Sequence, residues 1–164
     1  AYLAEPAGAP HGAVVVVQEI FGVNSHIRSV ADRWAAEGYL ALAPALFDRQ
    51  EKNIELGYTE ADMQRGFGLM QAAGLDAPLL DIDAARGELQ RLIGATGKAG
   101  VFGERDHWIP TDSVKAFAAA QPGVEVHIYA ADHGFNCDQR GSFDAAAAQL
   151  ARERSVAFLK QHLG

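Results

Sequence analysis

Two short polar segments in the C-terminal half of the sequence contain an acidic residue and a histidine that could act together. Asp106 lies three residues after Gly103, and His133 is followed by Gly134 and Phe135. A histidine that acts as a general base needs a carboxylate to fix its tautomer and to stabilise the imidazolium. The residues between the two segments leave room for one helix and one strand. We therefore expect Asp106 and His133 to lie at the ends of neighbouring strands.

The elements that would position this pair follow from the hydrophobic pattern. Beta-branched runs alternate with segments of 3.6-residue periodicity, which predicts an α/β fold: a parallel sheet of four to five strands with helices on both faces. We interpret residues 1–164 as a single domain. The expected strands are 13–17, 39–43, 99–102 and 124–129, with an edge-strand remnant at 2–4. The expected helices begin near 24 or 25, 59, 76, 112 and 144.

Several local signals refine these elements. Gly38 should end the first helix, and Thr59 with Asp62 resembles a capping box. Residues 46–58 are polar and aperiodic, which predicts a long loop. The side chains expected to face the core from the helices are Ile27, Val30, Ala31, Trp34, Leu79, Ile82, Leu89, Leu92, Val114, Phe117, Leu150, Ala151 and Phe158.

Composition and charge exclude several classes of protein. Hydrophobic residues make up 49% and charged residues 21% of the 164, which is typical of a globular protein. The net charge of −7 argues against binding to nucleic acid, which requires clustered Lys and Arg. No apolar run is long enough to span a membrane, and no signal peptide is visible. With a single cysteine, Cys137, these observations predict a cytoplasmic protein.

Ligands of open α/β sheets bind at the carboxyl ends of the strands. Besides the segments with Asp106 and His133, two other predicted strand ends carry polar residues, at 18–22 and 45–49. The sequence therefore places its polar residues where the predicted fold would have a site.

The sequence resembles the dienelactone hydrolase family of α/β-hydrolases over nearly its whole length. The chain order of acid before histidine is that of α/β-hydrolases. Five features carry the resemblance: Gln18 to Asn24 (QEIFGVN), Pro44 to Gln50 (PALFDRQ), Asp106 with Pro110, His133-Gly134-Phe135, and an Ala-rich closing helix with Glu153-Arg154 and Phe158-Leu159.

The resemblance implies roles for individual residues. Asp106 and His133 would be the acid and the base of a triad, and Glu19 the carboxylate that holds or releases a nucleophilic thiol. Arg49 would bind the substrate carboxylate, and the backbone N–H of Ile20 would donate to an oxyanion. The implied partner is a small-molecule ester or lactone, with no cofactor and no metal.

The sequence departs from the family pattern in two places. Cys137 stands where a second substrate-binding arginine is expected, four residues after the histidine. A glycine-flanked cysteine or serine on a sharp strand-to-helix turn is also expected after a strand like Gly97 to Val101. No G-x-[CS]-x-G sequence occurs, and the strand leads directly into the acid loop. We therefore predict a reduced α/β-hydrolase topology that lacks the nucleophile segment.

Three interpretations of this absence remain open. The first is a carboxylic-ester or lactone hydrolase that is impaired or inactive. The second is a non-catalytic deletion product that still binds small carboxylates through the region of Glu19, Arg49 and His133. The third is that the segment exists in the protein and is missing from the recorded sequence.

Other readings of the polar residues are weaker. Cys137 lies four residues after His133, and a protonated histidine nearby is one way to activate a thiol, but no strained turn presents Cys137 as a substitute nucleophile. His107, Asp132 and Asp138 match no metal-binding spacing. His26 could line the mouth of the site. Loss of a segment would expose apolar surface on the last helices and so favour a homodimer.

Overall fold

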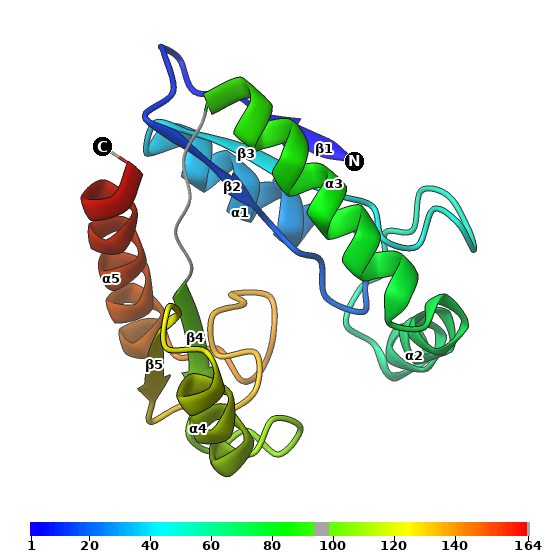
Figure 1. Cartoon of the computed structure of the whole chain (residues 1–164). Coiled ribbons are helices and arrows are strands. Elements are labelled where there is room, and N and C mark those ends of the chain that lie inside the picture. Colours follow the sequence, from blue (N-terminus) through cyan, green and yellow to red (C-terminus); the bar gives the residue numbers. More distant parts are fainter. Residues whose placement is uncertain (94–98, 164) are drawn as a thin grey trace. The chain divides into compact units, whose positions relative to one another are not determined.

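The computed structural model describes residues 1–93 and 99–163. The chain divides into two compact units, an N-terminal unit of Ala1–Ala95 and a C-terminal unit of Thr96–Gly164. The prediction of a single domain over residues 1–164 stays a prediction. Each unit contains its own strands and helices and is described separately below (Figure 1).

The sheet of the N-terminal unit has the strand order β1-β3-β2. Strand β2 (Gly12–Val15) runs parallel to β3 (Tyr39–Ala43), and β1 (Tyr2–Ala4) runs antiparallel to β3 on its other side. The edge strand predicted from residues 2–4 is therefore confirmed. The central strand β3 is almost entirely buried, which explains why its sequence is continuously apolar instead of alternating.

Two helices cover opposite faces of this sheet (Figure 1). Helix α1 (Ser25–Ala36) contacts β1 and β3, and α3 (Asp76–Ile93) contacts β2 and β3. The Asn24 side chain caps α1 by accepting the N–H of Ile27 at 3.2 Å. The backbone turns out of α1 at Gly38, whose φ of 92° favours glycine.

The predicted long loop of residues 46–58 is confirmed, and it is packed rather than loose. Phe47, Ile54 and Leu56 form a buried cluster with Phe21, against which Met63 of α2 (Glu60–Ala73) also packs. The N–H of Leu56 donates to the carbonyl of Phe21 at 2.8 Å. This cluster fastens the loop and the start of α2 to the segment that follows β2.

The capping box predicted for α2 is confirmed in both directions. The N–H of Asp62 donates to the Thr59 hydroxyl, and the N–H of Thr59 donates to the Asp62 carboxylate, each at 3.2 Å. Hydrogen bonds from Thr59 hold the pKa of Asp62 below its usual value. Two backbone donors at the helix start are thus satisfied by neighbouring side chains.

The C-terminal unit is built on two parallel strands, β4 (Ala99–Gly103) and β5 (Glu125–Tyr129). Helix α4 (Thr111–Ala120) packs against β5, and α5 (Ala145–Leu163) against β4. Its core contains Tyr129, Ala131, Phe135 and Ala151, with Val101 packed beside them. The buried Phe135 ties the segment after β5 to α5.

The α/β class is confirmed, and the described strands are distributed over a three-stranded and a two-stranded sheet. Some inward positions were predicted wrongly: the side chains of Leu79, Phe117 and Leu150 are exposed by 61%, 43% and 40%. The apolar stripe of a helix indicates which way the helix faces, but not how far the sheet beneath it extends. Leu92, Gly97 and Lys98 lie outside the residues whose side chains are described.

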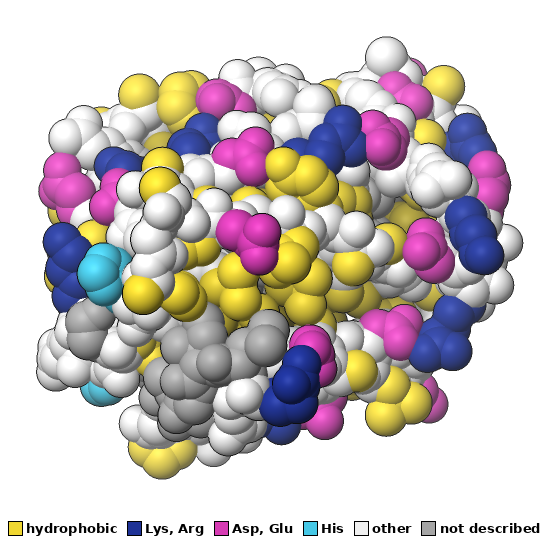
Figure 2. All heavy atoms as spheres, turned by 90° about the horizontal axis from the view of Figure 1, so that it is seen from above, with side chains coloured by type: hydrophobic (Ala, Val, Ile, Leu, Met, Phe, Trp, Pro, Cys, Tyr) yellow, Lys and Arg dark blue, Asp and Glu magenta, His cyan; other side chains and the backbone are white. Residues whose placement is uncertain are grey.

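The surface is of mixed charge. On the face drawn in Figure 2, acidic and basic side chains are interspersed. The exposed ion pairs of the protein include Arg65 with Glu51 at 2.6 Å. Among the described residues, no helix is long and apolar enough to cross a membrane.

Candidate active site

The structure brings together Asp106 and His133, as the sequence predicted. Asp106 lies in the loop after β4, and His133 lies in the loop after β5. His133 Nδ1 is 2.9 Å from Asp106 Oδ2. The Asp106 side chain is 6% exposed, whereas that of His133 is 38% exposed. The carboxylate is thus shielded while the imidazole remains accessible from outside.

Three hydrogen bonds fix the Asp106 carboxylate. Oδ1 accepts the backbone N–H groups of Trp108 at 2.8 Å and Ile109 at 2.9 Å, which leaves Oδ2 to face His133. Burial by itself raises the pKa of Asp106. The hydrogen bonds from His133 and the two backbone donors outweigh burial, so the net pKa lies below the usual value. Asp106 is therefore held as a carboxylate at neutral pH.

An ionised Asp106 determines which ring nitrogen of His133 carries a proton. A carboxylate accepts only, so Nδ1 must donate its proton to Oδ2. In the neutral ring Nε2 is then the basic nitrogen, free of the proton that would block it as a base. The arrangement can remove a proton from a reacting group at Nε2 and stabilise the resulting imidazolium.

The His133 loop is shaped by its glycine. Gly134 has a φ of 75°, and a Cβ built there would lie 2.6 Å from the guanidinium of Arg140. The loop folds back through hydrogen bonds from the N–H of Cys137 to the Gly134 carbonyl and from the N–H of Arg140 to the Cys137 carbonyl. The backbone conformation favours glycine at this position, whereas the Arg140 guanidinium is the end of a flexible side chain that could move aside.

Glu19 lies in the N-terminal unit, in the turn that follows β2. Its Oε2 accepts the Tyr58 hydroxyl at 3.0 Å, and the Asn24 amide donates to that hydroxyl at 3.4 Å and to the Leu56 carbonyl at 3.0 Å. Sequence reasoning missed Tyr58, because it lies in an aperiodic loop with no motif around it. Glu19 and Asn24 are thereby linked to the packed loop of residues 46–58.

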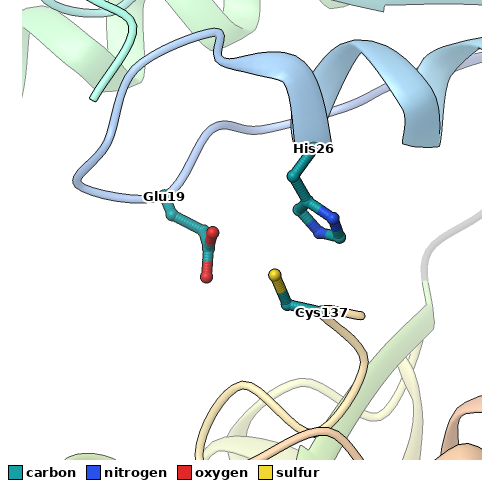
Figure 3. Close-up of side chains that lie close together, drawn as sticks. All are labelled: Glu19, His26 and Cys137. Atoms are coloured by element: carbon teal, nitrogen blue, oxygen red, sulfur yellow. The ribbon is translucent and has the colours of Figure 1, made fainter. Parts of the chain in front are cut away.

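Figure 3 draws three side chains from both units. Glu19 and His26 come from the N-terminal unit, His26 from the first turn of α1. Cys137 comes from the loop after β5 in the C-terminal unit, four residues past His133. The proposed role of His26 at the mouth of the site stays a prediction.

Close backbone contacts hold the turn that contains Glu19 and Ile20. A Cβ at Gly66 of α2 would clash with the Ile20 carbonyl, and one at Gly22 would clash with the Ile54 carbonyl. Gly66 therefore permits α2 to pack closely on the turn. The donor role of the Ile20 N–H stays a prediction.

Arg49 is engaged by an acidic residue of α3. Its Nη2 and Nε lie 2.6 and 3.2 Å from the two oxygens of Asp81, a bidentate pair. The Arg49 side chain is 57% exposed. A substrate carboxylate that binds Arg49 would have to share or displace Asp81.

A cavity of about 290 Å³ opens in the N-terminal unit beside the Glu19 turn. Its walls include Gln18, Arg28 and Glu55, the last two joined by an ion pair of 2.7 Å. Gln18 accepts the N–H of Leu46 at 2.9 Å and so links the two polar loops that follow β2 and β3.

Comparisons with known proteins identify the family to which this chain belongs. A protein of Azospirillum brasilense named "putative carboxymethylenebutenolidase" is 32% identical over 216 residues, which cover 100% of this chain and 94% of the relative. The carboxymethylenebutenolidase of Pseudomonas putida is 29% identical, over 97% of this chain and 89% of the relative.

Solved structures agree with this placement. A "putative dienelactone hydrolase" from Klebsiella pneumoniae has a TM-score of 0.78 at 28% identity and covers 98% of this chain and 92% of its own. A thermophilic esterase from Thermogutta terrifontis, with a TM-score of 0.55 at 16% identity over 98% of this chain and 88% of its own, shares the fold. The profile of the "Dienelactone hydrolase family" matches residues 1–101 and 90–163. The chain therefore belongs to the dienelactone hydrolase family.

Proposed function

We propose that this chain derives from a carboxylic-ester or lactone hydrolase of dienelactone-hydrolase type, and that Asp106 and His133 are the acid and base of its triad. The observation that carries the proposal is the 2.9 Å contact between His133 Nδ1 and a shielded Asp106 carboxylate. In this reaction His133 accepts the proton of the nucleophile and later protonates the leaving group. Asp106 holds the ring in the required tautomer.

Membership of the family suggests roles for three further residues of the chain. Glu19, held by Tyr58, would control the proton of a nucleophilic thiol, and the N–H of Ile20 would donate to the oxyanion. Arg49 would bind the carboxylate of an anionic substrate in exchange for Asp81. These roles follow from the family and from the positions of the residues in the sequence.

We further propose that the chain lacks the nucleophile segment and is impaired for this reason. The alignment with the Azospirillum brasilense protein extends over 216 positions although this chain has 164 residues. The two family matches meet at residues 90–101, where the sequence departs from the pattern. Both findings support an internal segment that relatives have and this chain does not. Losing one oxyanion donor alone costs roughly 10²–10³ in turnover.

The decisive experiment measures hydrolysis of an activated aryl ester by three proteins. These are the chain itself, the chain with the corresponding segment of a relative inserted within residues 90–101, and the inserted form with His133→Ala. We expect near-background hydrolysis from the first, recovery by at least roughly 10²-fold in the second, and its loss in the third. Hydrolysis that survives His133→Ala would overturn the triad assignment.

A second candidate function is a non-catalytic protein that binds small carboxylates, favoured by the retained Arg49 and His133 and the missing nucleophile. Titration calorimetry with a small carboxylate, with and without Arg49→Gln, tests it. Saturable binding without hydrolysis, weakened by the substitution, supports this reading. An intact mass above that calculated for the 164 residues would instead mean that the segment is present in the protein.

A further inference from the structure

A second charged pair joins the two loops that contain Asp106 and His133. Arg105, which precedes Asp106, places its Nε 3.0 Å from Oδ1 of Asp132, which precedes His133. Two consecutive residues of one loop therefore each contact one of two consecutive residues of the other. No role for Arg105 or Asp132 follows from the acid–base chemistry itself.

The backbone at the same place ties the loops together. The N–H of Glu104 donates to the Tyr129 carbonyl at 2.6 Å, and the N–H of Arg105 donates to the Ala131 carbonyl at 3.0 Å. A Cβ at Gly103 would lie 2.6 Å from the Ala131 carbonyl and 2.9 Å from that of Asp132. These contacts bring the bases of the loops together, but they end before Asp106 and His133.

Beyond this point, two side-chain links at successive positions are the Arg105–Asp132 and Asp106–His133 pairs. One link alone would fix a distance and leave the loops free to twist about it. Two links at successive positions fix both the distance and the twist. The His133 side chain is 38% exposed, so solvent can reach the ring that this arrangement must hold.

The signs of the charges agree with this function. Arg105 is cationic beside the Asp106 carboxylate, and Asp132 is anionic beside His133. Asp106 is thus preceded by a residue of opposite charge, whereas an acidic residue at position 105 would place two like charges at successive positions of one loop.

We propose that Arg105 and Asp132 are positioning residues that clamp the acid loop to the histidine loop and so hold His133 in the Nδ1–H tautomer facing Asp106. The clamp acts within the C-terminal unit. It deepens the proposed hydrolase function and rests on it for its biological purpose. An exposed pair of this kind contributes little to global stability, so its effect should be local.

The test reads the tautomer of His133 directly, without requiring turnover. Two-bond ¹⁵N–¹H correlation spectra of the full chain, recorded at a pH where the imidazole is neutral, separate Nδ1–H from Nε2–H rings. The spectrum of His133→Ala assigns the signal. Asp106→Asn defines the complete loss of the carboxylate's influence, and the exposed His107 in the same spectrum gives an internal reference.

We expect His133 of the unmodified chain to be in the Nδ1–H form. Arg105→Gln and Asp132→Asn should each move its signals toward the tautomer mixture of the reference, and Arg105→Lys should restore most of the shift. Arg65→Gln is the matched control, because the Arg65–Glu51 pair joins a helix and a loop with exposures of 52% and 53%, against 56% and 53% for the clamp. It should leave His133 unchanged.

Unchanged His133 signals in both Arg105→Gln and Asp132→Asn would overturn the clamp. An equal shift in the Arg65→Gln control would do so as well, since the effect would then be general. Backbone spectra of each variant confirm that the chain is folded. Failure of the ester-hydrolysis experiment with an intact clamp would count against the hydrolase function alone, so the two failures are distinguishable.

Discussion

The two regions that contain predicted site residues are held in different ways. In the C-terminal unit, Asp106 and His133 contact each other, and backbone donors complete the carboxylate's hydrogen bonds. In the N-terminal unit, Glu19 and Arg49 each have a partner that the sequence did not suggest, Tyr58 and Asp81. The comparison shows that a strand-end position identifies a polar residue as a candidate without identifying its partner.

The difference also concerns burial. The Asp106 side chain is 6% exposed and that of Arg49 is 57% exposed. A shielded charge depends on its partners far more than an exposed one, because solvent cannot replace them. The C-terminal pair should therefore respond strongly to substitution, and the N-terminal residues weakly.

Asp106→Asn should produce the largest change. The substitution removes a shielded charge that accepts three hydrogen bonds, and we expect the free energy of unfolding to fall by about 2 kcal/mol, the range for hydrogen bonds to charged groups. Urea unfolding at neutral pH measures it. Asp112→Asn is the control, because that side chain is 99% exposed and should change stability by less than about 0.5 kcal/mol. An equal loss of stability in Asp106→Asn and Asp112→Asn would contradict the expectation that the shielded carboxylate matters more than the exposed one.

Lowering the pH should abolish the difference in the free energy of unfolding between the unmodified chain and Asp106→Asn. The pKa of Asp106 in the folded chain lies below the ~3.9 of an unfolded aspartate, so the unfolded state takes up the proton first. Its stabilising contribution is complete above the unfolded value and is lost as the pH falls through the folded pKa. Urea unfolding of both proteins at successively lower pH should show that this difference in free energy decreases. A gap independent of pH would contradict the lowered pKa.

Tyr58→Phe should have a smaller effect in the N-terminal unit. It removes the hydroxyl that donates to Glu19 at 3.0 Å and keeps the ring packed against Phe21. We expect a loss of about 1 kcal/mol in the free energy of unfolding, as for one ordinary hydrogen bond. In the form with the inserted segment, the rate of ester hydrolysis should also fall if Glu19 controls the proton of the nucleophile. Stability loss comparable to that of Asp106→Asn would show that the N-terminal network is the stronger one.

Arg49→Gln should have the smallest effect on folding. Its pair with Asp81 is exposed, so the free energy of unfolding should change by less than about 0.5 kcal/mol. If Arg49 binds substrate, KM for an anionic ester should rise in the inserted form while KM for a neutral ester stays constant. Equal KM changes for both esters would exclude a role in recognising the carboxylate.

Much of the local structure could be read from the sequence. The capping box of α2, the buried strand β3 and the end of α1 at Gly38 depend on residues a few positions apart. Local backbone preferences decide such features. The exposed Phe117 and Leu150 were predicted wrongly because an amphipathic stripe gives the direction of the core but not the width of the sheet beneath it.

By itself the sequence determined the α/β class, the family resemblance, and the candidates Asp106 and His133. The tertiary structure decided which side chain each polar residue meets: His133 with Asp106 and Arg105 with Asp132, each pair 27 residues apart, Arg49 with Asp81 at 32 and Tyr58 with Glu19 at 39. These partners come from irregular loops or from separate elements, whose approach depends on packing. No spacing rule links such positions, because the hydrogen bonds form only after the strands and helices have brought the loops together.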